Sequence, residues 1–164
     1  MSVRVRPATA ADLDFMMAVV PRLRAFGPPP LRPADALDRA EREMLRRVLV
    51  EPGPDDVLLI AELGGTGPAG VAYAHGATDY FTHERHGHLS IIIVSEQGEG
   101  RGVGRALLDA VEAWSAAQGH RFITLNVFTG NQRARHVYER AGYGEDVVRY
   151  VKELPLREGT PSPP

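Results

Sequence analysis

Glu99-Gly-Arg-Gly-Val-Gly-Arg105 is a glycine-rich stretch between the apolar run Leu89–Val94 and a segment, 103–118, with helical periodicity. A short, continuously apolar run is typical of a strand buried on both faces. A turn from such a strand into a helix directs several backbone N–H groups at one point, where the helix dipole adds partial positive charge. The stretch therefore predicts a site for an anion such as a pyrophosphate. The apolar stripe of the helix consists of Val103, Leu107, Leu108, Val111 and Trp114.

The type of phosphate site is narrowed by what the stretch lacks. A P-loop needs Gly-Lys followed by Ser or Thr, and no such triplet occurs. The glycines also fail the G-x-G-x-x-G spacing of a dinucleotide-binding turn. Lys152 is the only lysine, so charge-assisted contacts to phosphate would come from Arg101 and Arg105. The alternative is a turn that binds nothing. We favour it less, because ordering three alternating glycines costs conformational entropy that no bound ligand would offset.

The rest of the chain alternates between strand and helix patterns. The predicted order is strand, two helices, three strands, helix, strand, helix, strand, with a polar and aromatic loop at Thr78–Gly87. This order indicates a mixed α/β single domain over residues 1–157, followed by a disordered tail at 158–164. The strands are expected at Ser2–Arg6, Val57–Leu63, Gly70–Ala74, Leu89–Val94, Phe122–Phe128 and Val147–Leu154, and the other helices after Thr9, at Asp35–Val50 and from Asn131 to Ala141.

Composition excludes several classes of function. The 164 residues carry a formal charge of −2, which gives no reason to expect nucleic-acid or anionic-membrane binding. There is no cysteine, so disulfides, thiolate metal sites and a cysteine nucleophile are excluded. The N-terminal residues lack the apolar core of a signal peptide, and no apolar run is long enough to span a membrane. We therefore expect a cytoplasmic protein.

Two motifs together resemble the GNAT superfamily of N-acetyltransferases. The stretch 99–104 is similar to the acetyl-CoA signature Arg/Gln-x-x-Gly-x-Gly/Ala, although Glu99 departs from its first position. Residues 131–143, Asn-x-x-Ala-x-x-Val-Tyr-Glu-Arg-x-Gly-Tyr, resemble a second segment of the family. The resemblance covers most of Val57–Leu154. It implies a GNAT-like fold, with a central mixed, mostly antiparallel sheet and flanking helices in the order β-α-α-β-β-β-α-β-α-β, with room for one more strand.

The resemblance also implies a cofactor and roles for residues. Acetyl-CoA would be the co-substrate, with its pantetheine arm hydrogen-bonded to the backbone at Ile93 and Val94 and positioned by Asn131. Tyr138 matches the general acid that protonates the departing thiolate. Its ordinary pKa near ~10 keeps its hydroxyl protonated at neutral pH. The pyrophosphate would lie on the turn, which comprises Glu99, Gly100, Arg101, Gly102, Val103, Gly104 and Arg105.

The general base is left open. His88 lies just before the apolar run and could accept the amine proton directly or through water. It could equally be an ordinary loop histidine, with the proton leaving through solvent. The spacing His83-x-x-His86-x-His88 also resembles zinc ligands, but no carboxylate partner is evident, and we expect no metal.

The acceptor is predicted only as a class, a small-molecule or peptide amine. By the resemblance, Phe26, Tyr80 and Phe81 lie in loops that border the acceptor pocket; packing beneath those loops is the alternative. With no cysteine to carry an acyl group, the acetyl group should pass directly to a primary amine within a ternary complex. A different class of function is a non-catalytic acyl-CoA-binding or sensing module. The oligomeric state, a homodimer included, is open.

Overall fold

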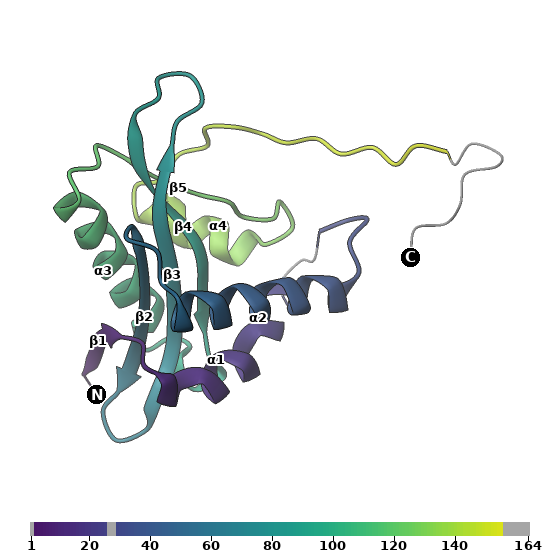
Figure 1. Ribbon diagram of the computed structural model, residues 1–164. Helices are drawn as coiled ribbons and strands as arrows, with labels where there is room; N and C mark the ends of the chain where they lie inside the picture. The colour runs from purple at the N-terminus through teal and green to yellow at the C-terminus, as the bar shows by residue number, and fades with distance from the viewer. Residues whose placement is uncertain (1, 26–28, 156–164) are drawn as a thin grey trace.

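A single sheet of five strands organises the molecule, seen in a computed structural model that describes residues 2–25 and 29–155 (Figure 1). The four N-terminal strands pair in sequence order and antiparallel, and the fifth runs parallel to the fourth. The strands are β1 (Val3–Pro7), β2 (Asp56–Leu63), β3 (Gly67–Thr78), β4 (Arg85–Val94) and β5 (Ile123–Leu125).

Helices cover both faces of this sheet. Two helices, α1 (Leu13–Val19) and α2 (Ala34–Val50), lie on one face, and α3 (Val103–Ala117) lies on the other (Figure 1). The last helix, α4 (Gln132–Arg140), follows β5. Three short 3-10 helices complete the described elements: η1 (Ala10–Asp12), η2 (Val20–Arg24) and η3 (Glu96–Gly98).

The core consists of one apolar cluster on each face of the sheet. The stripe predicted for α3 is buried from Val103 to Val111 and packs on alternate residues of β2, β3 and β4. The opposite cluster joins Met16 of α1 and Leu45 of α2 to Ile60 and Ile91 of the sheet. Because strand side chains alternate between faces, the three strands β2, β3 and β4 supply side chains to both clusters. The mixed, mostly antiparallel α/β class predicted from the sequence is confirmed.

Three predicted strands or loops need correction. The strand expected at Phe122–Phe128 forms only over Ile123–Leu125. Residues Val147–Leu154 do not form a strand in the described structure; all of them are exposed. A strand needs a neighbouring edge to hydrogen-bond, and this segment runs away from the sheet (Figure 1). The expected loop Thr78–Gly87 is also shorter, since β3 continues to Thr78 and β4 begins at Arg85. No helix in the described ranges is both long and apolar enough to cross a bilayer.

Candidate active site

The glycine turn joins β4 to α3 and has the backbone geometry of an anion cradle. Gly100 and Gly102 have φ angles of 68° and 79°, the left-handed region that side chains disfavour. The first hydrogen bond of α3 runs from Ala106 N to Gly102 O at 2.9 Å. The N–H groups of Val103–Arg105 precede that bond and have no acceptor within the helix. Three donors at the positive end of a 15-residue helix are therefore available to an anion.

Close packing against β4 holds this turn in place. A Cβ on Gly104 would lie 3.3 Å from Cγ2 of Val94, tighter than ordinary van der Waals contact. A Cβ on Gly98 would lie 2.7 Å from the Ala69 carbonyl oxygen, which is a clash. The glycines thus allow the end of β4 and the start of α3 to approach each other closely.

The last part of β4, next to the glycine turn, is paired on one side only. β5 pairs with β4 only over Gly87–Leu89, whereas β3 pairs with β4 as far as Val94. Beyond Leu89, β4 therefore has no strand on its β5 side in the described structure. Ser95 N donates to Ala69 O at 2.9 Å on the β3 side. Because successive residues of a strand point their backbone groups in opposite directions, the N–H and carbonyl of Val94 face the open side.

Ile93 has a different position from the one expected. By the same alternation its backbone groups face β3, and its side chain is buried in the cluster under α1 and α2. The open edge of β4 thus offers the N–H of Val94, and not the backbone of Ile93, to a ligand.

Glu99 joins three segments around the turn. Its carboxylate accepts a hydrogen bond from Arg22 of η2 and forms an ion pair with Arg133 of α4 at 3.2 Å. Arg22 also donates from Nε to the carbonyl oxygen of Val94 at 2.7 Å. The two arginines come from opposite ends of the chain, and no sequence signal marks either of them. They place two positive groups beside the cradle, at a position where the family motif has a basic or amide residue instead of Glu99.

The remaining residues of the predicted cofactor site are spread over the turn and α4. Arg101 is exposed, and Arg105 forms an ion pair with Asp109 one helical turn away at 2.8 Å. Asn131 caps α4, as predicted, because its Oδ1 accepts from Ala134 N at 3.1 Å. The cap uses the carboxamide oxygen and leaves the amide NH2 to other contacts.

Tyr138 lies on α4, packed against the cluster on the α3 face. Burial raises the pKa of its phenol to about 12, so the hydroxyl stays protonated throughout the physiological range. Its ring meets Tyr143 edge to face, with centroids 5.8 Å apart. Ala134, which receives the Asn131 cap, is four residues earlier and therefore on the same face of the helix.

His88 is a strand residue, not a loop residue. It lies in the last stretch of β4 that pairs with β5, one residue before the two strands separate. Its Nδ1 is 2.8 Å from Oγ1 of Thr124. Burial, followed by the neighbouring His75 and His86, lowers the pKa of His88 below its ordinary 6.5. The ring is therefore neutral at pH 7, the form in which it can accept a proton.

The histidine cluster does not form a metal site. His86 is buried and stacks on Phe122 with centroids 4.7 Å apart, while His83 lies in the β3–β4 turn with a φ of 59°. Among residues 2–25 and 29–155, no group of three His, Cys, Asp or Glu side chains could hold an ion.

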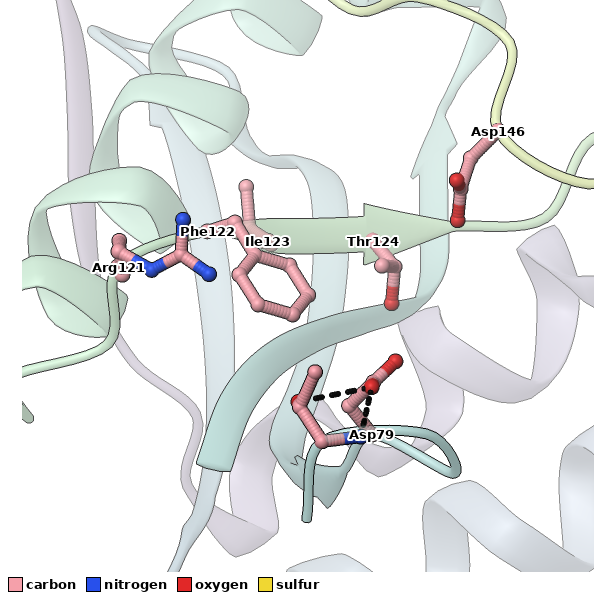
Figure 2. A pocket seen from close by; sticks show the side chains of 7 residues that line it. Asp79, Arg121, Phe122, Ile123, Thr124 and Asp146 are labelled. Atoms are coloured by element: carbon pink, nitrogen blue, oxygen red, sulfur yellow. Dashed lines mark hydrogen bonds between the residues drawn. The ribbon is translucent and has the colours of Figure 1, made fainter. Parts of the chain in front are cut away.

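A cleft opens beside Thr124, the partner of His88. It has a volume of about 330 Å³ and lies between the β3–β4 turn, β5 and the chain after α4 (Figure 2). Two carboxylates, those of Asp79 and Asp146, line it, and hydrogen bonds from Thr82 hold the pKa of Asp79 below its usual value. Arg121 also lines the cleft, but its guanidinium is paired with Glu84 at 2.8 Å. The two carboxylates therefore leave the lining with a net negative charge, which attracts a protonated amine.

The predicted acceptor residues are only partly placed. Tyr80 and Phe81 are more than four-fifths exposed at the β3–β4 turn, where their rings meet edge to face at 5.2 Å. They do not pack beneath a loop, so that alternative is wrong. Phe26 lies outside the described residues.

Sequence reasoning also missed Glu41, a half-buried carboxylate with one oxygen shielded from solvent. Glu41 lies on the same face of α2 as Leu45 and Val48, and its Oε2 is buried with no hydrogen-bond partner in the described structure. Burial raises the pKa of this carboxyl. The spacing could have revealed it, because Glu41 is four residues before Leu45 and so lies in the apolar stripe of the helix. A charged residue is costly to bury at such a position.

The comparisons with known proteins identify the family. A model described as the acetyltransferase (GNAT) family matches residues 23–143, which is more than half of the chain. The chain belongs to the GNAT family. It is therefore an acyltransferase of the N-acetyltransferase type, from a family that uses acetyl-CoA.

Relatives in sequence carry the same general description. An "Uncharacterized N-acetyltransferase YhfO" of Bacillus subtilis (strain 168) is 26% identical over 155 residues, covering 93% of this chain and 99% of that protein. Mycothiol acetyltransferase of Propionibacterium freudenreichii is 44% identical over 73 residues. That second match covers 43% of this chain and 23% of the larger protein.

Solved structures share the GNAT fold. An acetyl transferase from Pyrococcus furiosus superposes with a TM-score of 0.74 at 17% identity, covering 93% of this chain and all of the other (100%). AAC(6')-Iy, solved with a bisubstrate analogue, has a TM-score of 0.66 at 23% identity, covering 94% of this chain and 100% of the other. At these identities the likeness concerns the fold alone.

Proposed function

We propose that this GNAT protein transfers the acetyl group of acetyl-CoA directly to a primary amine, with both substrates bound at once. The observation that carries the proposal is the separation of β4 from β5 beyond Leu89. This separation exposes one edge of β4. The exposed edge leads to the glycine turn, where the N–H groups of Val103–Arg105 have no acceptor within the helix. Such an edge suits an extended chain of amide groups that ends in a pyrophosphate, which describes coenzyme A.

The residues of the chain would divide the binding between them. The N–H of Val94 faces the open edge and would donate to the amide-bearing arm of the cofactor, while the Val94 carbonyl accepts from Arg22. The N–H groups of Val103–Arg105 would hold the pyrophosphate, with Gly100 and Gly102 setting the turn. When bound, acetyl-CoA supplies the acyl group and the thiol leaving group. Holding both reactants side by side is itself a large part of such catalysis.

Two side chains would move protons. His88, neutral at pH 7, would take the proton that the amine loses as its nitrogen bonds to the acyl carbon. Tyr138 would donate its hydroxyl proton to the sulfur as the carbon–sulfur bond breaks. The raised pKa of Tyr138 keeps that proton available at every physiological pH. No cysteine exists to carry the acyl group, which favours direct transfer.

The proposed acceptor is a small-molecule or peptide amine that carries positive charge. Asp79 and Asp146 give the cleft beside Thr124 its negative lining. One structural neighbour, AAC(6')-Iy, is named an aminoglycoside N-acetyltransferase. An aminoglycoside is an example of an acceptor with several positive charges.

An amine panel tests the proposal. The protein contains no thiol of its own, so a thiol reagent detects only released coenzyme A. The panel contains an aminoglycoside, a polyamine, amino acids and a peptide with a free N-terminus. We expect at least one amine to release coenzyme A in proportion to the acetylated product. Binding of acetyl-CoA without turnover of any amine would instead favour the acyl-CoA-binding module.

The role of His88 predicts a specific pH profile. Because its pKa lies below 6.5, the base is present at pH 7 and is lost as the pH falls through that lowered value. With an active acceptor, kcat/KM of the wild type should therefore fall on the acidic side. The His88→Gln variant should turn over about 10²-fold more slowly and lose this acidic limb beyond what amine protonation causes. His83→Gln, in the exposed turn, is the matched control; an unchanged acidic limb in His88→Gln would exclude His88.

Replacement of Glu99 by a neutral residue is expected to increase the affinity for coenzyme A. Its carboxylate lies beside the proposed pyrophosphate site and occupies Arg22 and Arg133. Replacement by glutamine removes a negative charge that repels phosphate and removes the ion pairs of this carboxylate with the two arginines. Glu99→Gln should bind coenzyme A about threefold to tenfold more tightly at low salt, and the gain should shrink as salt is added.

The matched control for this effect is Glu96→Gln. Glu96 also pairs with Arg22, at 3.3 Å, but its side chain is 88% exposed. Isothermal titration should show little change for this variant. Weaker binding by Glu99→Gln would mean that the ion pairs support the cradle and do not compete with the cofactor.

A further inference from the structure

Four polar residues, here named the polar row, lie side by side across the sheet on the face that α1 and α2 cover. Asp56 of β2 is opposite His75 of β3 in the strand register. His75 is in turn opposite His88 of β4, and His88 is opposite Thr124 of β5. Residues directly opposite each other in paired strands point to the same face of the sheet. Tyr73, two residues before His75, belongs to the apolar cluster under α1 and α2, which places the row on that face.

The two histidine rings of the polar row are neighbours. Their centroids are 5.4 Å apart, with an angle of 55° between the ring planes. On its other side His75 is flanked by Tyr73, with centroids 5.7 Å apart, and the Tyr73 hydroxyl donates to Asp56 Oδ1 at 2.9 Å. His75 is therefore held between His88, at the point where β4 and β5 separate, and a hydrogen-bonded pair on the other side.

A backbone contact decides which nitrogen of His75 can take a proton. Nδ1 of His75 is 2.9 Å from the carbonyl oxygen of Gly76. A carbonyl oxygen can only accept, so Nδ1 carries a hydrogen and donates it. The lone pair of the neutral His75 ring is therefore on Nε2. A proton that binds there gives the ring a positive charge beside His88.

The strands around His88 bring two titratable groups to it. Burial lowers the pKa of His88 most, and positive charge on His75 of β3 or on His86 of β4 lowers it further. Thr124 of β5, whose Oγ1 is 2.8 Å from His88 Nδ1, carries no charge. His75 has its ring beside that of His88, whereas His86 stacks on Phe122 with centroids 4.7 Å apart.

The charged groups of the neighbouring elements act on other members of this region. Arg47 of α2 and Asp56 of β2 act on Tyr73. The carboxylates of Asp79 and Glu84, at the two ends of the β3–β4 turn, interact with His86. The charge that bears most on His88 is therefore the one on the neighbouring histidine of β3.

We propose that His75 is a positioning residue for acetyl transfer: the His75 and His88 rings share a single proton, which keeps His88 free to accept the proton of the amine down to a lower pH than a lone histidine would. The inference rests on the role of His88 in the proposed function. Two imidazole rings at this distance repel each other when both are charged, so they titrate as a pair. With a proton on Nε2 of His75, His88 is harder to protonate and remains a base. His75 itself touches neither substrate.

The titration of His88 in the protein without substrates tests this pairing directly. NMR spectra of isotope-labelled histidine rings follow each ring through a pH series, and the His88→Gln variant assigns the signals of His88. In His75→Gln and in His75→Phe, the pKa of His88 should be about 0.5 to 1 pH unit higher than in the wild type, because the neighbouring charge is gone. Phenylalanine keeps a ring at this position, so a change common to both variants comes from charge and not from packing. His136→Gln, in the exposed part of α4, is the matched control and should leave the pKa of His88 unaltered.

The pH profile of turnover provides the second readout. With an active acceptor, the acidic limb of kcat/KM should move to higher pH in both His75 variants by as much as the pKa of His88 does. The rate on the plateau at higher pH should stay close to that of the wild type. A purely structural role of His75 would instead lower the plateau and leave the acidic limb in place, which would overturn the proposal.

The wild-type protein covers the case in which the variants do not fold. Because coupled groups each report both titrations, the His75 and His88 signals should each show two steps in the same pH series. Independent single-step curves, or an unchanged pKa of His88 in both His75 variants, would overturn the pairing whether or not the enzyme turns over. A pKa of His88 that rises while the acidic limb stays in place would overturn the role of His75 by showing that His88 is not the base, and would identify the proposed function as the part that failed.

Discussion

Replacement of Tyr138 by phenylalanine should lower kcat by about 10²–10³-fold while acetyl-CoA still binds. The variant keeps the ring that packs against the α3-side core, so the fold is expected to persist. It removes the one proton that we assign to the departing thiol. Without a donor, the sulfur must leave as a free thiolate, which raises the barrier of the step that breaks the carbon–sulfur bond. Steady-state turnover and calorimetric binding measure the two quantities separately.

Tyr143→Phe is the control for this prediction. Tyr143 lies 5.8 Å from Tyr138, ring to ring, and its hydroxyl donates to Glu112 at 3.0 Å. The variant should lose stability, by about 1.5–3 kcal/mol for a hydrogen bond to a charged group, and keep its turnover. If Tyr138→Phe turned over at the wild-type rate, the general acid would have to be another group or water.

Replacement of Gly102 by valine should weaken coenzyme A binding at least tenfold, which corresponds to about 1.4 kcal/mol. Gly102 is the N-cap of α3 with a φ of 79°, and a β-branched residue is a true outlier there. The turn must shift to relieve this strain, and the N–H groups of Val103–Arg105 then no longer point at one place. Arg101→Ala and Arg105→Ala should weaken binding less, because Arg105 already pairs with Asp109.

Gly119→Val is the control that separates an effect on cofactor binding from the backbone strain that any side chain causes at a positive φ. Gly119 follows the other end of α3 with a φ of 80°, and a Cβ there meets nothing within 4 Å, as at Gly102. At 1.5 Å per residue, the helix places the two glycines roughly 25 Å apart. Both variants should lose similar thermal stability, but only Gly102→Val should lose affinity. If the arginine variants lost more affinity than Gly102→Val, the backbone would not be the main phosphate ligand.

Most elements of the fold were predictable because their signals are local. The α3 stripe, the Asn131 cap and the glycine turn each depend on residues within a few positions of one another, and the structure has all three. The cofactor residues that we propose on the turn follow from the same local pattern. The start of β4 was missed because His86 and His88 look polar in sequence, although the strand buries one and half-buries the other.

The final strand shows the limit of such predictions. The pattern of Val147–Leu154 correctly favours an extended chain but does not say which edge that chain joins. Strand pairing is decided by contacts between distant segments, and in one subunit this segment has none. The same limit applies to Glu99, whose partners Arg22 and Arg133 are 77 and 34 positions away.

By itself, the sequence determined the α/β class, the cradle, the capped α4 that carries Tyr138 and the absence of any thiol, because these are properties of composition and neighbouring residues. Only the tertiary structure decided that β4 separates from β5 after Leu89, that His88 contacts Thr124 across 36 positions, and that Glu99 ties η2 and α4 to the turn. These features arise from the pairing register and packing of segments far apart in the chain, which no local pattern encodes. The glycine turn begins as a backbone motif, and the surrounding fold makes it one end of a site.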